Sequence, residues 1–103
     1  MGAVMYRRKS RLVYYSKRYK KHITVPYGYP SDGATGAIDI DSNGWWVHDV
    51  LCDKGVFDDG TPCTNWQAST ILSDILREEG RWVRAIYWWP FTYLFGGGEC
   101  RKN

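Results

Sequence analysis

A long stretch rich in Gly and Asp, residues 27–44, predicts a loop that separates two parts of the chain with different sequence patterns. Within residues 1–26, short runs of β-branched and aromatic residues are typical of β-strands, and Pro26 ends the last run. Three later segments have helical patterns, and these are 45–55, 65–79 and 81–95. A chain of 103 residues has room for one hydrophobic core. We therefore expect one α+β domain in which a small antiparallel sheet of two or three basic strands packs with three helices.

Local signals mark the ends of the first two predicted helices. Ser42 or Asn43 can cap the first helix, and Gly55 can end it. Thr64 lies three residues before Gln67, which is the spacing of a capping box at the start of the second helix. The sequence therefore predicts a short connection between two helices, which favours an antiparallel pair.

The third predicted helix, residues 81–95, is dense in Trp and Tyr. Pro90 lies inside it, so we expect this helix to kink or break there. Trp82, Trp88 and Trp89 are candidates for a surface that rests on a lipid interface. The alternative interpretation is that these rings pack in the hydrophobic core.

The net charge of +3 is distributed unevenly along the chain. Residues 1–22 hold eight basic and no acidic residues, whereas the remainder holds six basic and eleven acidic residues. The basic residues of this first part are Arg7, Arg8, Lys9, Arg11, Lys17, Arg18, Lys20 and Lys21. Such a patch could bind nucleic acid, an anionic lipid surface or an acidic partner protein, or it could simply be a solvated pair of strands.

Three cysteines, Cys52, Cys63 and Cys100, are an odd number and cannot form a complete set of intramolecular disulfides. Reduced thiols fit a reducing, intracellular compartment. No apolar run follows the basic N-terminal residues, so we expect no secretory signal. No run approaches the ~20 apolar residues of a spanning helix, so we expect a soluble or peripheral protein.

The candidate catalytic residues are Asp32 in the Gly-rich stretch and the neighbouring pair His48 and Asp49. Calcium prefers carboxylate and carbonyl oxygens, so Asp32 and Asp49 are candidate calcium ligands. His48 could then activate a water molecule, because the ordinary pKa of histidine is ~6.5. In the alternative interpretation, His48 and Asp49 tie the loop to the helices as a buried polar network. Zinc is less well supported, since His48 and Cys52 supply only two ligands.

Three motifs resemble a known family: VPYGYPSDGAT at residues 25–35, VHDVL at residues 47–51 and WQASTIL at residues 66–72. In order and spacing they are similar to domain-of-unknown-function family 1353, whose members are small phage and prophage proteins. This chain departs from the family pattern at Cys52, where the family has Tyr, and at Ser69, where it has Asp. The resemblance implies a phage accessory protein that is located in the bacterial host cytoplasm or the virion.

A more distant likeness is to the secreted and parvoviral phospholipases A2, which also pair a Tyr-Gly loop with a His-Asp helix. This likeness implies that Asp49 and the loop bind calcium and that His48 is the base. The Asp that orients the histidine in those enzymes would fall on Ser69. Asp74 is a poor substitute because it lies five positions further on, ~140° round the helix from Ser69.

These observations lead to three functional hypotheses. The first is a non-enzymatic phage component, either a virion accessory or a host-interaction protein that binds a phage or host partner. The second is a calcium-dependent, phospholipase A2-like hydrolase of lipids or esters. The third is nucleic-acid binding through the basic strands, in which interleaved tyrosines stack on single-stranded bases.

Overall fold

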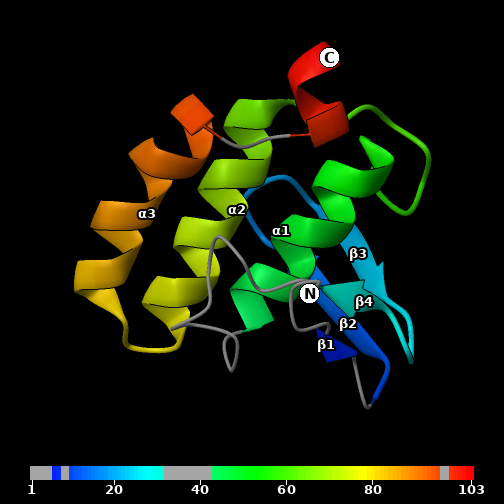
Figure 1. Ribbon diagram of the computed structural model, residues 1–103, viewed down its shortest axis with the longest axis horizontal. Coiled ribbons are helices and arrows are strands. Elements are labelled where there is room, and N and C mark those ends of the chain that lie inside the picture. The colour runs from blue at the N-terminus through cyan, green and yellow to red at the C-terminus, as the bar shows by residue number, and fades with distance from the viewer. Residues whose placement is uncertain (1–5, 8–9, 32–42, 96–97) are drawn as a thin grey trace, which may run out of the picture.

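The computed structural model describes residues 6–7, 10–31, 43–95 and 98–103. It combines antiparallel strand pairs with three α-helices, which confirms the predicted α+β class (Figure 1). The strands are β1 (Tyr6–Arg7), β2 (Leu12–Ser16), β3 (Lys21–Val25) and β4 (Pro30–Ser31). The helices are α1 (Asn43–Lys54), α2 (Asn65–Glu78), α3 (Trp82–Phe95) and the short 3-10 helix η2 (Gly98–Lys102).

The main strand pair is the hairpin β2–β3, in which Leu12 is opposite Val25 and Ser16 is opposite Lys21. Ile23 and Val25 are buried, so one face of β3 packs on the helices. The other strand pair joins β1 to β4. Because β4 lies within residues 27–44, the prediction of one continuous loop there was wrong at residues 30–31. The strand β4 forms by pairing with β1, which is far away in the sequence, so the residues around β4 do not reveal it.

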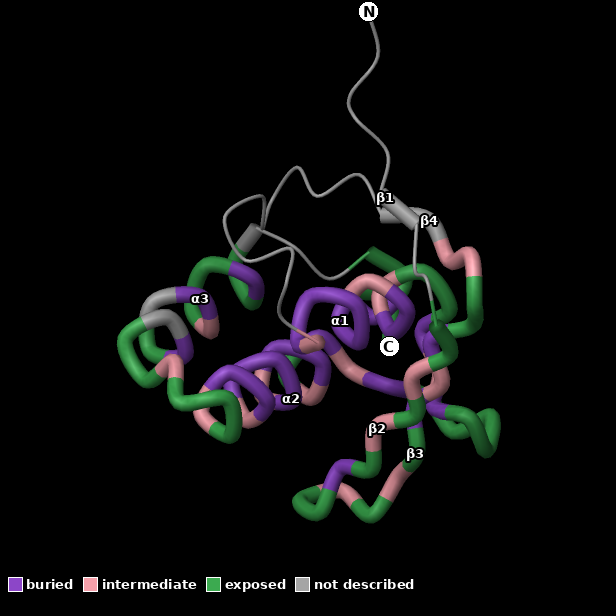
Figure 2. Tube along the Cα trace, turned by 90° about the horizontal axis from the view of Figure 1, so that it is seen from below, coloured by how far each residue is buried: buried purple, intermediate pink, exposed green. Residues whose placement is uncertain are grey.

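Helix α2 packs against α1 on one side and α3 on the other. It begins with the predicted capping box, since Thr64 Oγ1 accepts from the Gln67 backbone N–H at 3.1 Å and Gln67 Oε1 accepts from the Thr64 N–H at 2.9 Å. Figure 2 shows that the buried residues concentrate where α1 and α2 face each other, while much of the β2–β3 hairpin is exposed.

Buried residues form two hydrophobic clusters. The first includes Ile23 and Val25 of the hairpin with Val47, Leu51 and Ile71 of α1 and α2. The second lies between the helices and consists of Trp45, Leu72, Leu76, Ala85 and Trp88. The two clusters attach the hairpin to one side of the helical layer and α3 to the other.

Helix α3 continues through Pro90 to Phe95, so the expected break at the proline does not occur. A proline removes the hydrogen bond to the carbonyl four residues earlier, here that of Ile86. Ile86 lies on the exposed side of α3, where water can satisfy its carbonyl. Beyond the proline, Asn65 Nδ2 donates to the Tyr93 carbonyl at 2.6 Å, which holds the last turn against α2.

Candidate functional site

The first candidate site is the predicted catalytic pair on α1. His48 is only 5% exposed, and its ring meets that of Trp45 edge-on at 5.9 Å between centroids. Cys52 Sγ lies 3.6 Å from each ring nitrogen. Among the described residues, the partners of His48 are thus an indole and a sulfur, with no carboxylate to orient the ring. Burial lowers the pKa of His48 to about 4, so the imidazole is neutral at pH 7.

Asp49 follows His48 but lies on a more exposed side of α1. Its backbone carbonyl accepts a hydrogen bond from the Tyr29 hydroxyl at 3.2 Å, which ties the segment after β3 to the helix. Asp32, the other candidate calcium ligand, lies outside the described residues. Within the described segments, no group of three or more His, Cys, Asp or Glu side chains is arranged to hold a metal ion. Calcium binding therefore stays a prediction.

Ser69 and Asp74 have structural partners of their own. Ser69 is fully buried, and its hydroxyl forms a 3.0 Å hydrogen bond with that of Thr92 on α3. Asp74 pairs with Arg18 at 2.8 Å and with Arg77 at 2.5 Å. Ser69 therefore joins α2 to α3, and Asp74 joins α2 to the hairpin.

The predicted basic patch is divided between several environments. Arg7 is in β1, while Arg8 and Lys9 lie outside the described residues. Lys21 pairs with Asp59 at 2.6 Å. Among the patch residues whose exposure the structure describes, the exposed ones are Arg11, Lys17, Arg18 and Lys20. The last three of these lie in the turn between β2 and β3, so that turn is the positively charged part of the hairpin.

The three candidate interface tryptophans have different environments. Trp82 is 62% exposed, whereas Trp88 lies in the second hydrophobic cluster. Trp89 is half-buried, and its indole N–H donates to Thr70 Oγ1 at 3.0 Å. Trp88 therefore packs inside the fold, and only Trp82 and Trp89 are accessible to a partner. None of the helices in the described segments combines the length and apolar character needed to cross a bilayer.

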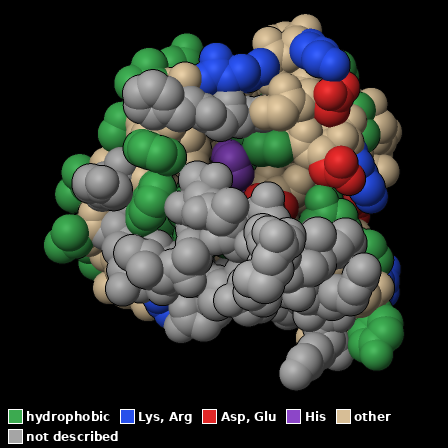
Figure 3. Space-filling model, viewed as in Figure 1, with side chains coloured by type: hydrophobic (Ala, Val, Ile, Leu, Met, Phe, Trp, Pro, Cys, Tyr) green, Lys and Arg blue, Asp and Glu red, His purple; other side chains and the backbone are tan. Residues whose placement is uncertain are grey.

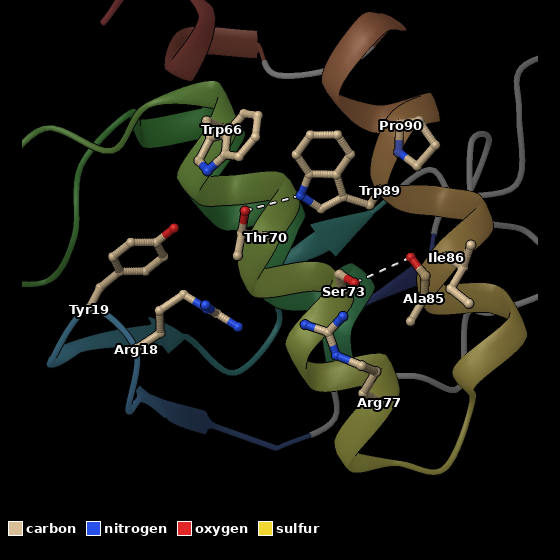
Figure 4. Close-up of a pocket in the computed structure, with 10 residues that line it drawn as sticks. All are labelled: Arg18, Tyr19, Trp66, Thr70, Ser73, Arg77, Ala85, Ile86, Trp89 and Pro90. Atoms are coloured by element: carbon tan, nitrogen blue, oxygen red, sulfur yellow. Dashed lines mark hydrogen bonds between the residues drawn. The ribbon is translucent and has the colours of Figure 1, made fainter.

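A groove of about 360 Å³ lies between the β2–β3 turn, α2 and α3. Figure 4 shows Arg18 and Tyr19 on one side, α2 side chains along the floor and α3 side chains on the other side. The α2 residues are Trp66, Thr70, Ser73 and Arg77, and the α3 residues are Ala85, Ile86, Trp89 and Pro90. The structure thus brings a predicted basic residue, Arg18, together with a predicted interface residue, Trp89.

Aromatic rings form one end of this groove. The rings of Trp66 and Trp89 meet edge-on with centroids 4.7 Å apart, and Tyr93 stacks on Trp89 at 5.3 Å. Because Trp89 is also hydrogen-bonded to Thr70, its ring is fixed in position. Trp66 remains 54% exposed and offers a free surface to a ligand. The end of the groove is therefore a rigid aromatic wall in which the indole of Trp66 is more exposed than that of Trp89.

The opposite end of the groove is cationic. Arg18 and Arg77 share one carboxylate, that of Asp74, so the three side chains together carry a charge of +1. Burial raises the pKa of Asp74, but the hydrogen bonds from Arg18 and Arg77 outweigh it and hold the pKa below its ordinary value. Asp74 therefore stays ionised at neutral pH and positions both guanidinium groups. Lys17 and Lys20 are exposed in the same turn as Arg18 and add positive charge to it.

The exposed side of α3 continues the groove as an apolar surface. We call the following residues the α3 face: Trp82, Val83, Ile86 and Leu94, which are 62%, 81%, 71% and 60% exposed. Figure 3 shows hydrophobic side chains along the edge of the molecule that α3 forms. Exposed apolar patches of this kind are typical of interaction surfaces.

Sequence reasoning missed the contributions of α2 to this groove. Trp66, Thr70, Ser73 and Arg77 follow a spacing of four, three and four residues, which places them on one side of a helix. That spacing was visible in the sequence. What was not visible is that α3 and the hairpin turn border the same side.

Comparisons with protein-family models, with curated proteins and with solved structures gave no match. The geometry of the groove is therefore the basis for assigning a function.

Proposed function

We propose that this chain is a non-enzymatic phage accessory protein, a virion or host-interaction component, that docks an acidic, partly apolar segment of a partner protein. The docking site is the groove together with the α3 face. The observation that carries this proposal is the position of Arg18 and Arg77 beside an exposed aromatic and aliphatic surface. Protein interfaces are enriched in the same combination of Trp, Tyr and Arg.

The charge of the site favours an acidic partner. The side chain of Arg18 is half exposed although it pairs with Asp74, and Lys17 and Lys20 lie in the same turn. A carboxylate of the partner would meet several donors there, and Arg18 can form charge-assisted hydrogen bonds with it. The partner's apolar side chains would then cover Ile86 on α3 and Trp66 on α2.

The shape and chemistry of the surface favour a protein over other polyanions. Single-stranded nucleic acid stacks on aromatic faces but gains little from aliphatic side chains such as Val83 and Ile86. A lipid surface is flat on this scale, whereas the groove is concave and can take a protruding side chain. The buried, neutral state of His48 supports a structural role for that residue.

Selection from a displayed library of random 16-residue peptides tests this proposal. We expect enriched peptides to combine Asp or Glu with Leu, Ile, Phe or Trp. Calorimetry with synthetic copies of the enriched peptides should show binding to the wild-type protein. Arg18→Glu reverses a charge of the site and Ile86→Asp makes an apolar position acidic, so each should weaken this binding at least tenfold. Arg11→Glu is the matched control, since Arg11 is exposed but does not line the groove.

Two outcomes would contradict the proposal. One is selection of peptides that bind the Arg18→Glu and Ile86→Asp variants as tightly as the wild type. The other is tighter binding of a 20-residue oligo-dT or of vesicles containing phosphatidylglycerol than of any selected peptide. The oligonucleotide result would favour the nucleic-acid hypothesis, and the vesicle result would favour a membrane-surface role.

A further inference from the structure

The three cysteines converge at the C-terminal end of α1, although they are far apart in the sequence. Cys52 lies on the last turns of α1, Cys63 precedes α2, and Cys100 lies in η2. Cys100 Sγ is 3.1 Å from the carbonyl of Leu51, the residue before Cys52. The thiols of Cys52 and Cys63 both lie close enough to the Cys100 thiol to lower its pKa. Cys100 is therefore the central member of a cluster of three thiols.

The backbone holds this cluster in place. A Cβ added at Gly98 would come within 2.6 Å of the Cys52 carbonyl oxygen, so η2 lies directly on the last turns of α1. Asn103, which directly follows η2, donates from Nδ2 to the carbonyls of Gly55 at 2.7 Å and Cys63 at 2.8 Å. These contacts fix the distance between the thiol-bearing segments before any reaction.

The three thiols differ in exposure. Cys63 and Cys100 are completely buried, whereas Cys52 is partly exposed. A small oxidant therefore reaches Cys52 first, and Cys100 is the thiol behind it. An accessible cysteine with a second cysteine in contact is the arrangement found in redox-sensing pairs.

We propose that Cys52 and Cys100 form a redox-active pair in which Cys52 reacts with hydrogen peroxide and Cys100 resolves the product into a disulfide. This inference is independent of the docking function proposed above. In the first step, the Cys52 thiolate attacks peroxide; an S–O bond forms, the O–O bond breaks and hydroxide leaves. In the second step, the Cys100 thiolate attacks the Cys52 sulfur; the S–S bond forms, the S–O bond breaks and a second hydroxide leaves.

The two thiol protons neutralise the two hydroxides, so two thiols are oxidised and one peroxide is reduced to two waters. The neighbouring thiols of Cys52 and Cys63 lower the pKa of Cys100, which favours the thiolate needed in the second step. The neighbouring Cys100 thiol and burial raise the pKa of Cys63, so Cys63 stays a thiol. The resulting disulfide would fasten η2 to α1. Because Arg101 of η2 donates to the Tyr93 carbonyl at 2.8 Å, the bond would also stiffen the end of α3.

The test is treatment of the purified, reduced protein with equimolar hydrogen peroxide, followed by intact mass spectrometry and non-reducing peptide mapping. We expect a loss of about 2 Da, a Cys52–Cys100 linkage and an alkylatable Cys63. Closing a loop of this length should raise Tm by about 10 °C, and dithiothreitol should reverse the rise. Cys52→Ala, at a partly exposed position, should abolish the linkage and keep the fold.

Cys63→Ala is the matched control, because Cys63 is as buried as Cys100 but is not a member of the proposed pair. It should retain the Cys52–Cys100 linkage, whereas Cys100→Ala should lose it. A Cys63–Cys100 linkage, three alkylatable thiols after treatment, or sulfinic acid at Cys52 without a disulfide would each overturn the proposal. Circular dichroism of every variant verifies that it is folded.

Discussion

Arg18 in the β2–β3 turn and Asp74 on α2 form a two-point ion pair, with Nε–Oδ2 and Nη2–Oδ1 distances of 2.8 and 2.9 Å. Arg77 donates to Oδ1 of the same carboxylate at 2.5 Å. The contact attaches the end of the hairpin to α2 and positions both guanidinium groups in the groove. The carboxylate of Asp74 therefore stabilises the fold and also positions the two arginines of the proposed docking site.

We expect Asp74→Asn to lower the free energy of unfolding by about 1–2 kcal/mol at pH 7, because charge-assisted hydrogen bonds are lost. The pKa of Asp74 is lower in the folded state, so its contribution is present above the carboxylate's unfolded pKa and is lost as pH falls through the folded one. Urea unfolding of both proteins should give equal stabilities near pH 2. A difference that persists unchanged at that pH would contradict the ion-pair explanation.

Stability should also fall between pH 6.5 and 4 because of His48. Its pKa is lowered to about 4 in the folded state, so in this interval the unfolded chain binds a proton that the folded chain does not. The expected loss is up to about 3 kcal/mol. His48→Asn should flatten the pH dependence in this interval, and NMR of the imidazole should show titration near pH 4. Titration near pH 6.5 would indicate a solvated histidine and would revive the catalytic hypothesis.

Ser69→Asp restores the carboxylate that the phospholipase likeness implies, but we expect it to destabilise the fold without producing esterase activity. The new carboxylate would be buried against Thr92, at a cost of about 2–4 kcal/mol. Ser69→Ala, the control, removes one hydrogen bond and should cost about 1 kcal/mol. Thermal unfolding and hydrolysis of a fluorogenic ester are the measurements. Activity gained in a stable Ser69→Asp variant would show that position 69 faces the catalytic histidine.

Gly98→Ala should destabilise the protein more than Gly60→Ala. Both glycines have positive φ, +48° and +84°, so each substitution has a conformational cost of about 1 kcal/mol. At Gly60 the added Cβ meets nothing within 4 Å, whereas at Gly98 it would collide with the Cys52 carbonyl. We expect the Gly98 substitution to lower the free energy of unfolding by an additional amount of about 1–3 kcal/mol, which is the range for overpacking. If urea unfolding shows that both variants lose the same free energy of unfolding, then η2 is not held against α1.

Calcium titration separates the docking proposal from the hydrolase hypothesis. The proposed function assigns no metal to Asp49, so we expect no saturable heat up to millimolar calcium. Asp49→Asn should then behave like the wild type. Saturable binding that disappears in Asp49→Asn would instead establish a calcium site at the His-Asp helix.

Local sequence signals determined where α1 ends and where α2 begins. The capping box of Thr64 and Gln67 and the end of α1 before Gly55 depend on neighbouring residues, and the structure confirms both. The alternation that buries Ile23 and Val25 is equally local. These features follow from short-range hydrogen bonding and from the periodicity of side chains.

Tertiary structure alone decided which of these elements meet. The sequence could not show that Trp88 is buried while Trp82 is exposed, because that depends on how α3 is rotated against α2. Continuation of α3 through Pro90 likewise depends on packing that offsets a lost hydrogen bond. The approach of Arg18 to Asp74 and the convergence of three cysteines around Cys100 are set by long-range packing. No local pattern specifies such contacts, because they form only when distant hydrophobic faces are buried against each other.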